Sequence, residues 1–201
     1  MKFRNLIWCL LAVLALASCK EEDDAVEEYA NWQATNDTYY SNLVSETKQK
    51  IDKGQTTWSL LPCYTMPEEY YTFGYYDYIV AEKLSQGTGT TSPLHTDSVE
   101  VHYSGRLLPS ASYPQGYLFD RSYSGTFDPV TATPSKFVVS GVVKGFATAL
   151  MHMHRGDRWR IYIPYQLAYG STARTSVPAY STLIFDLQLE DFWRKTKGDR
   201  E

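Results

Sequence analysis

The chain has 201 residues, of which 15% are aromatic, and it carries a formal net charge of −4 at pH 7. An acidic chain without clusters of Lys and Arg lacks the basic surface that nucleic-acid binding needs, so we expect no nucleic-acid partner. A mature chain of about 180 residues is long enough to bury a stabilising core without disulfides.

Residues 1–18 have the anatomy of a bacterial secretory signal. Lys2 and Arg4 precede an apolar run at residues 6–17, which ends in small residues before Cys19. This run is too short to cross a bilayer as a helix, which takes about 20 residues. The sequence Leu-Ala-Ser-Cys at residues 16–19 resembles the lipobox of bacterial lipoproteins. We therefore expect attachment to a membrane through lipid on Cys19, and an ordinary cleaved signal followed by an incidental Cys is the alternative.

Residues 19–26 are predicted to be an acidic tether. Lys20 is followed by Glu-Glu-Asp-Asp, a charged run that has no apolar side chains to bury and should be solvated. A charged run beside a lipidated Cys resembles the surface-export signal of lipoproteins in the Bacteroidetes. The expected location is therefore the cell envelope, as an outer-membrane lipoprotein that faces either the periplasm or the outside.

The number of cysteines limits which disulfides the mature chain can form. Cys9 leaves with the signal and Cys19 is taken by lipid, so only Cys63 remains and no intrachain disulfide can form. No base is identifiable that would make Cys63 a nucleophile. The simplest interpretation of this residue is a small buried apolar side chain.

Residues 27–76 are predicted to form a helix and an aromatic-rich arm. Between Glu27 and about Lys50 the apolar residues have the spacing of one helix face, and Gly54 follows as a stop signal. These apolar residues are Tyr29, Trp32, Tyr39, Tyr40, Leu43 and Val44. Residues 56–76 are too apolar for a free linker, so we expect an irregular arm or an edge strand. The helix is also a candidate surface for a partner or a homodimer.

Residues 77–194 are predicted to form one α+β domain. Alternating apolar and polar residues indicate strands at 77–84, 98–108, 136–140, 159–163 and 183–189. Gly105 would allow a bend in the second of these strands. The main helix is expected at 146–151, where Phe146, Ala149 and Leu150 share one face. One helix laid across an antiparallel sheet is an α+β architecture.

Three separated pieces of this domain carry a further pattern. They are V-H-Y-S-G, G-V-V-K-G-F, and A-Y-G followed by T-L-I-F-D-L-Q-L. In this order they resemble the FKBP-type peptidyl-prolyl cis-trans isomerases. The resemblance implies an FKBP-like fold, a twisted antiparallel sheet wrapped around one short helix. It also implies rotation of X-Pro peptide bonds in exported, proline-containing polypeptides, an accompanying chaperone role, and no cofactor.

The resemblance also implies a set of site residues. In the family a shallow apolar pocket between helix and sheet holds the proline ring, over an aromatic floor at the start of the helix. Matched motif by motif, the catalytic residues are Asp120, Tyr169 and the floor residue Phe146. The substrate-binding residues are Tyr103, Phe119, Val142, Val143, Val177 and Phe185. The N–H of Val143 and the hydroxyl of Tyr169 would hold flanking carbonyls, and Asp120 would orient the polar edge of the pocket.

Several positions depart from the family pattern. Phe146 stands where active members most often have Trp, the loop at 173–176 lacks the common His-Pro, and the loop before Phe119 is longer than usual. We therefore expect lower activity and an altered sequence preference, with the pocket retained.

Other interpretations stay open. A vestigial pocket would make the domain a non-catalytic FKBP-like binding module of a cell-envelope lipoprotein. Some of the 17 tyrosines could be exposed rings that stack on sugars. His102 is expected to be a satisfied structural residue. His152 and His154, two apart near a helix end, point in different directions and predict no metal site.

Overall fold

The computed structural model describes residues 27–66 and 72–194. The signal, the lipobox with Cys19 and the acidic tether lie outside these residues, so what the sequence predicts for them stays a prediction.

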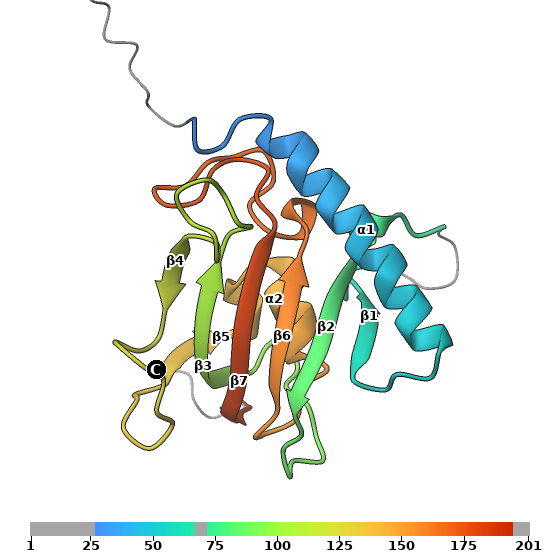
Figure 1. Ribbon diagram of the computed structural model, residues 1–201. Helices are drawn as coiled ribbons and strands as arrows, with labels where there is room; N and C mark the ends of the chain where they lie inside the picture. The colour runs from blue at the N-terminus through green and yellow to red at the C-terminus, as the bar shows by residue number, and fades with distance from the viewer. Residues whose placement is uncertain (1–26, 67–71, 195–201) are drawn as a thin grey trace, which may run out of the picture.

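One antiparallel sheet organises the fold (Figure 1). Its strands are β1 (Trp58–Pro62), β2 (Tyr78–Ser85), β3 (Ser98–Arg106), β4 (Leu118–Arg121), β5 (Ser135–Val138), β6 (Arg158–Ile163) and β7 (Leu183–Trp193). The strand order is β1-β2-β6-β7-β3-β4, and β5 pairs with β3 as well. The free side of β3 is thus divided, because β4 pairs with its last residues and β5 with its first.

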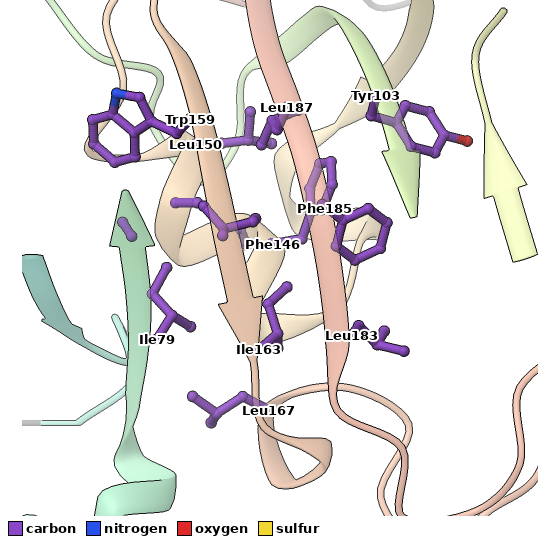
Figure 2. Close-up of a cluster of buried hydrophobic side chains, with 14 of the residues drawn as sticks. Ile79, Tyr103, Phe146, Leu150, Trp159, Ile163, Leu167, Leu183, Phe185 and Leu187 are labelled. Carbon is purple, nitrogen blue, oxygen red and sulfur yellow. The ribbon is translucent and has the colours of Figure 1, made fainter. Parts of the chain in front are cut away.

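The core lies between the sheet and the short helix α2 (Lys144–Leu150), as Figure 2 shows. Alternate residues of β6 and β7 are buried, which confirms the predicted strand periodicity. The inward residues are Trp159, Ile161, Ile163, Leu183, Phe185, Leu187 and Leu189. At α2 a Cβ on Gly145 would lie 2.3 Å from Cγ2 of Ile163. Only glycine therefore lets the helix approach β6 this closely.

Helix α2 is buried on more than the one face predicted. Ala147 and Thr148 are as inaccessible as Phe146 and Ala149. The physical reason is a second cover, since residues 63–66 pack on the side of α2 away from the sheet. There the backbone N–H of Tyr64 donates to Oγ1 of Thr148 at 3.3 Å. Cys63, in the same segment, is 1% exposed, which confirms its prediction as a buried apolar residue.

The long helix α1 (Trp32–Asp52) crosses the opposite face of the sheet (Figure 1). Tyr40, Leu43 and Val44 form a second, smaller core with Val80 of β2. Ile79, the strand neighbour of Val80, packs in the core beside α2, and adjacent residues of a strand point to opposite faces. The two helices therefore cover different faces. The helix predicted in this region is confirmed.

The aromatic arm joins the same sheet. It contributes β1, which pairs along its length with β2 and forms an edge, so the predicted edge strand is confirmed. Short 3-10 helices connect other elements, namely η1 (Tyr75–Asp77), η2 (Val139–Gly141) and η3 (Tyr165–Leu167). The strand at 58–62 thus belongs to the same sheet as the strands of residues 77–194. The apolar face of α1 is buried on this sheet, so its outward face alone is left for the predicted homodimer, which stays a prediction.

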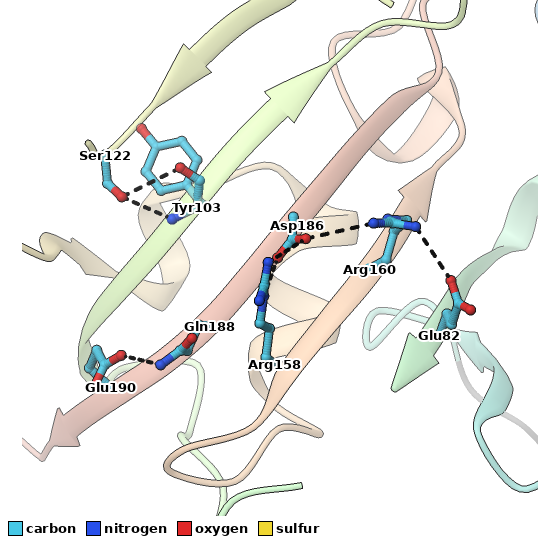
Figure 3. Close-up of polar contacts among 8 residues, drawn as sticks. All are labelled: Glu82, Tyr103, Ser122, Arg158, Arg160, Asp186, Gln188 and Glu190. Atoms are coloured by element: carbon cyan, nitrogen blue, oxygen red, sulfur yellow. Dashed lines mark hydrogen bonds and ion pairs between the residues drawn. The ribbon is translucent and has the colours of Figure 1, made fainter. Parts of the chain in front are cut away.

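Charged pairs line the exposed part of the α1 face of the sheet (Figure 3). Arg158 donates to both carboxylate oxygens of Asp186, at 2.7 and 3.0 Å, and Arg160 lies 3.8 Å from Asp186 and 3.9 Å from Glu82. His102, on the same face, is only 3% exposed, and its Nδ1 has no hydrogen-bond partner among the described residues. Its Nε2 lies 3.8 Å from Oε1 of Glu190, so the prediction of a satisfied structural residue holds for its burial but not for Nδ1. Its ring packs against Phe127 instead.

No helix in residues 27–66 or 72–194 is long and apolar enough to cross a membrane.

The attachment of α1 should make stability fall at alkaline pH. The hydroxyl of Tyr40 lies 2.9 Å from the carbonyl oxygens of Tyr78 and Tyr162, and burial raises its pKa well above the ordinary value. An unfolded tyrosine loses its proton near pH 10, whereas the folded one keeps it. The stabilisation is therefore complete below about pH 10 and is lost as pH rises toward the folded pKa. Urea titrations at pH 8 and pH 11 should show a smaller fall in Tyr40→Phe than in the unchanged protein, and equal falls would contradict this account.

Candidate active site

Most of the site residues predicted from the sequence line one cavity of about 250 Å³. It opens between the start of α2 and the inner face of β3 and β7. Its lining residues are Tyr103, Asp120, Phe137, Gly141, Val142, Val143, Phe146, Tyr169 and Phe185. A larger cavity of about 480 Å³ lies in the loop at 121–133, but its lining is almost entirely polar. The smaller one has the apolar walls and few polar groups typical of a ligand site.

Phe146 forms the floor of this cavity. It lies in the first turn of α2, it is 4% exposed, and its ring stands nearly perpendicular to that of Phe185 at a centroid distance of 5.0 Å. Tyr103 approaches Phe146 edge-to-face at 6.1 Å. Figure 2 shows the side chain of Phe146 directed from α2 toward Phe185 of the sheet. Edge-to-face packing holds these rings in fixed orientations and leaves a rigid apolar surface.

One edge of the cavity is polar. The hydroxyl of Tyr103 donates to Oδ2 of Asp120 at 2.8 Å, which joins β3 to β4. Burial, and then the hydrogen bond to the carboxylate, raise the pKa of the Tyr103 hydroxyl. The hydroxyl is therefore a neutral donor at physiological pH. The backbone N–H of Tyr103 donates in turn to Oγ of Ser122 at 2.9 Å (Figure 3), so the backbone and the side chain of Tyr103 are both held by β4 and the residue that follows it.

The mouth of the cavity carries two groups suited to binding carbonyls. Val143 is the residue immediately before α2, and its backbone N–H has no hydrogen-bond partner in the described part of the chain. Tyr169 follows η3 and is half-buried, with the guanidinium of Arg174 5.4 Å from its ring centroid. A free N–H at a helix start is a good donor for a ligand oxygen.

Two predicted residues do not line this cavity. Phe119 packs edge-to-face behind Phe185, at 5.5 Å, and so supports the wall from outside. Val177 is 5% exposed and lines a different cavity together with Tyr29 and Tyr117. Phe119 thus supports the wall that Phe185 forms, and Val177 lies in another cavity. The predicted contact of these two residues with substrate stays a prediction.

Phe137 and Gly141 line the cavity although the sequence analysis did not select them. The ring of Phe137 on β5 lies 5.7 Å from that of Tyr103 and 6.5 Å from that of Phe146. The available signal was the position of Phe137 in a predicted strand that leads directly into the helix carrying the floor.

The arrangement is suited to holding an apolar ring and its flanking carbonyl groups. Among the described residues, no group of three His, Cys, Asp or Glu is placed to hold a metal ion. The cavity itself offers one carboxylate, two phenol groups and one backbone donor around a hydrocarbon interior.

Comparison with known proteins gives a consistent result. Residues 89–190 match the family described as FKBP-type peptidyl-prolyl cis-trans isomerase. The chain is 35% identical over 139 residues to the macrophage infectivity potentiator of Trypanosoma cruzi, and this alignment covers 61% of the chain and 65% of the relative. It is 38% identical over 107 residues to an FKBP-type 22 kDa peptidyl-prolyl cis-trans isomerase of Escherichia coli K12, and this alignment covers 53% of the chain and 46% of the relative. The chain thus spans less than two thirds of the length of either relative.

A solved structure agrees with these matches. The crystal structure of a peptidyl-prolyl cis-trans isomerase from Pseudomonas syringae pv. tomato DC3000 superposes with a TM-score of 0.51 at 25% identity, over 78% of this chain and 96% of that one. The expected FKBP-like α+β fold is confirmed.

Gly105 should be essential to the aromatic wall. A Cβ at this position would lie 2.6 Å from atoms of both Phe119 and Phe185. Gly105→Ala should lower the free energy of unfolding by about 1–3 kcal/mol, the usual cost of overpacking, and shift the ring NMR signals of Phe185. Ser104→Ala, on the other face of the same strand, is the matched control and should change neither. Unshifted Phe185 signals in Gly105→Ala would contradict this packing.

Proposed function

The chain belongs to the family of FKBP-type peptidyl-prolyl cis-trans isomerases, and from that premise we propose that it catalyses rotation of X-Pro peptide bonds at the cavity above Phe146. One observation carries the proposal. The cavity combines a rigid aromatic floor, a Tyr103–Asp120 hydrogen bond at its edge and an unpartnered Val143 N–H at its mouth.

The physical problem is rotation about a partial double bond. Its barrier is about 18–20 kcal/mol, so an X-Pro bond left alone isomerises in tens to hundreds of seconds. When the bond twists, resonance between nitrogen and carbonyl is lost and the amide loses part of its charge separation. A dry apolar cavity therefore stabilises the twisted amide relative to the planar one, which is catalysis by differential binding.

Each lining group has a role in this proposal. Phe146 and Phe185 hold the proline ring, while the Val143 N–H and the Tyr169 hydroxyl hold carbonyls on either side of the rotating bond. Asp120 fixes the hydroxyl of Tyr103 and with it the polar edge. Because phenylalanine offers less ring contact than the indole common at the floor position, the rate should be reduced and the preference for the residue before proline altered.

The phenylalanine at the floor of the cavity also supports a second candidate function. With Phe146 at the floor, the domain would bind proline-containing segments without accelerating their isomerisation, as a non-catalytic FKBP-like module of the cell envelope. This module would bind the same peptides, so catalysis is the property that separates the two candidates.

The N-terminal sequence supports a location for this activity. We propose that the protein is lipid-anchored through Cys19 as an outer-membrane lipoprotein, facing the periplasm or the outside, and that it acts on exported polypeptides with a chaperone role. The secretory signal and the lipobox support export and lipidation.

A homodimer through the outward face of α1 belongs to the same proposal, and sedimentation of the purified protein tests it.

Catalysis should depend on the cavity residues. Asp120→Ala and Tyr169→Phe each remove one hydrogen-bonding group, and the loss of about 1–1.4 kcal/mol should lower kcat/KM for short X-Pro peptides about five- to tenfold. NMR exchange spectroscopy of the peptide measures the rate. Glu46→Ala, which removes an exposed carboxylate on α1, is the control and should keep the full rate. Peptide binding without exchange enhancement by the unchanged protein would support the non-catalytic module instead.

Lipidation should depend on Cys19. In bacterial cells supplied with an alkyne-tagged fatty acid, the protein should carry the label and sediment with membranes, because several acyl chains give stable anchoring. Cys19→Ser should lose both label and sedimentation, whereas Cys63→Ser should keep them. A labelled Cys19→Ser protein would contradict lipidation at this residue.

A further inference from the structure

A further cavity, of about 470 Å³, has no role in the proposed function. It is distinct from the cavity above Phe146, which we call the isomerase cavity. We call it the tyrosine cavity, because Tyr29, Tyr113 and Tyr117 line it, together with Arg174, Val177 and Pro178. Tyr29 comes from the turn before α1, which lies outside the segment matched by the family. The cavity is therefore built partly by residues that the family match does not include.

The walls of the tyrosine cavity are held by α1 and the turn before it. The carboxylate of Glu28 accepts hydrogen bonds from the hydroxyl of Ser110 and, at 3.0 Å, from the backbone N–H of Ser112. The loop that carries Pro178 is held just beyond the cavity, where the indole of Trp32 donates to Oγ of Ser181 at 2.8 Å and the side chain of Asn36 accepts from the N–H of Thr182 at 2.7 Å. The hydroxyl of Ser181 donates in turn to the carbonyl of Pro178 at 2.7 Å. Both loops are thus fixed before any ligand arrives, which lowers the entropic cost of binding.

Arg174 connects the two cavities. Its guanidinium lines the tyrosine cavity and lies 5.4 Å from the ring centroid of Tyr169, which lines the isomerase cavity. Arg174 is exposed and forms no ion pair among the described residues. Arg174 therefore belongs to the lining of one cavity and lies over a ring that lines the other. A polypeptide with its X-Pro bond in one cavity extends by about 3.3–3.6 Å per residue, so a few residues carry it into the other.

We infer that the tyrosine cavity is a second binding site for the same polypeptide, selecting segments in which an aromatic or proline side chain and a carboxylate lie a few residues from the isomerised proline. The inference rests on the proposed function. The rings of Tyr113 and Tyr117 and the apolar Val177 and Pro178 bind the ring of the segment, and Arg174 pairs with its carboxylate. Aromatic-lined grooves are a common way of binding extended, proline-containing chains.

The test compares short and long substrates in the full protein. The short substrate is a tetrapeptide with one X-Pro bond. The long ones are two peptides of about 15 residues with the same bond and an Asp-Tyr pair about six residues to either side, which covers both chain directions. The unchanged protein should show a higher kcat/KM for at least one long peptide. Equal values for all three peptides, as expected of a surface that stacks on sugars instead, would overturn the inference.

Tyr113→Ala is the decisive variant, because this tyrosine is 41% exposed and belongs to neither the core nor the isomerase cavity. It should lower kcat/KM for the favoured long peptide about fivefold, the effect of losing an aromatic contact at an interface, and leave the tetrapeptide rate unchanged. Tyr76→Ala, which removes a 43% exposed tyrosine elsewhere, is the matched control and should change neither. An unaltered long-peptide rate in Tyr113→Ala would overturn the inference.

A binding measurement separates this inference from the proposed function. If the unchanged protein accelerates none of the peptides, the isomerase proposal fails, yet fluorescence anisotropy with a labelled long peptide still tests the cavity. A Kd about fivefold weaker in Tyr113→Ala than in Tyr76→Ala supports the second site. Equal Kd values in the two variants overturn it.

Discussion

The packing of Phe146 against Phe185, at a ring-centroid distance of 5.0 Å, is the contact on which the rest of the site depends. It requires α2 to lie close to the sheet, which the absence of a side chain at Gly145 permits. The position of Phe185 in turn requires its ring and that of Phe119 to pack over the backbone of β3, which the absence of a side chain at Gly105 permits. Were either glycine to carry a Cβ, the floor or the wall would have to move, and the apolar cavity between them would change shape.

The opposite face of the sheet serves a different purpose. There α1 packs on β2, and residues 28–36, in α1 and the turn before it, bind the loops at 110–112 and 181–182. The N-terminal part of the chain contributes nothing to the lining of that cavity within the residues described. It holds these two loops instead, and Tyr29 adds to the lining of the tyrosine cavity.

Local patterns predicted much of this arrangement. Period-two burial predicted β6 and β7, and the ordered motifs selected Phe146, Tyr103 and Phe185. What local patterns could not predict depends on contacts distant in sequence. Residues 63–66 cover α2 although several strands separate the two segments in the sequence. Val177 and Tyr29, which are also distant in sequence, line one cavity. Phe119 and Asp120 were both assigned to the cavity, but only Asp120 lines it, because the ring of Phe119 packs against Phe185 and the carboxylate of Asp120 bonds to Tyr103.

The proposed function depends most on one binding mode, a proline ring above Phe146 with a carbonyl on the Val143 N–H. The most direct measurement is an amide NMR titration of the isotope-labelled protein with a short X-Pro peptide. We expect a downfield shift of the Val143 amide and large changes at Phe146 and Tyr169, together with exchange broadening of the peptide's proline signals. Changes confined to the far face of the sheet, or a Val143 amide that does not move at saturation, would contradict it.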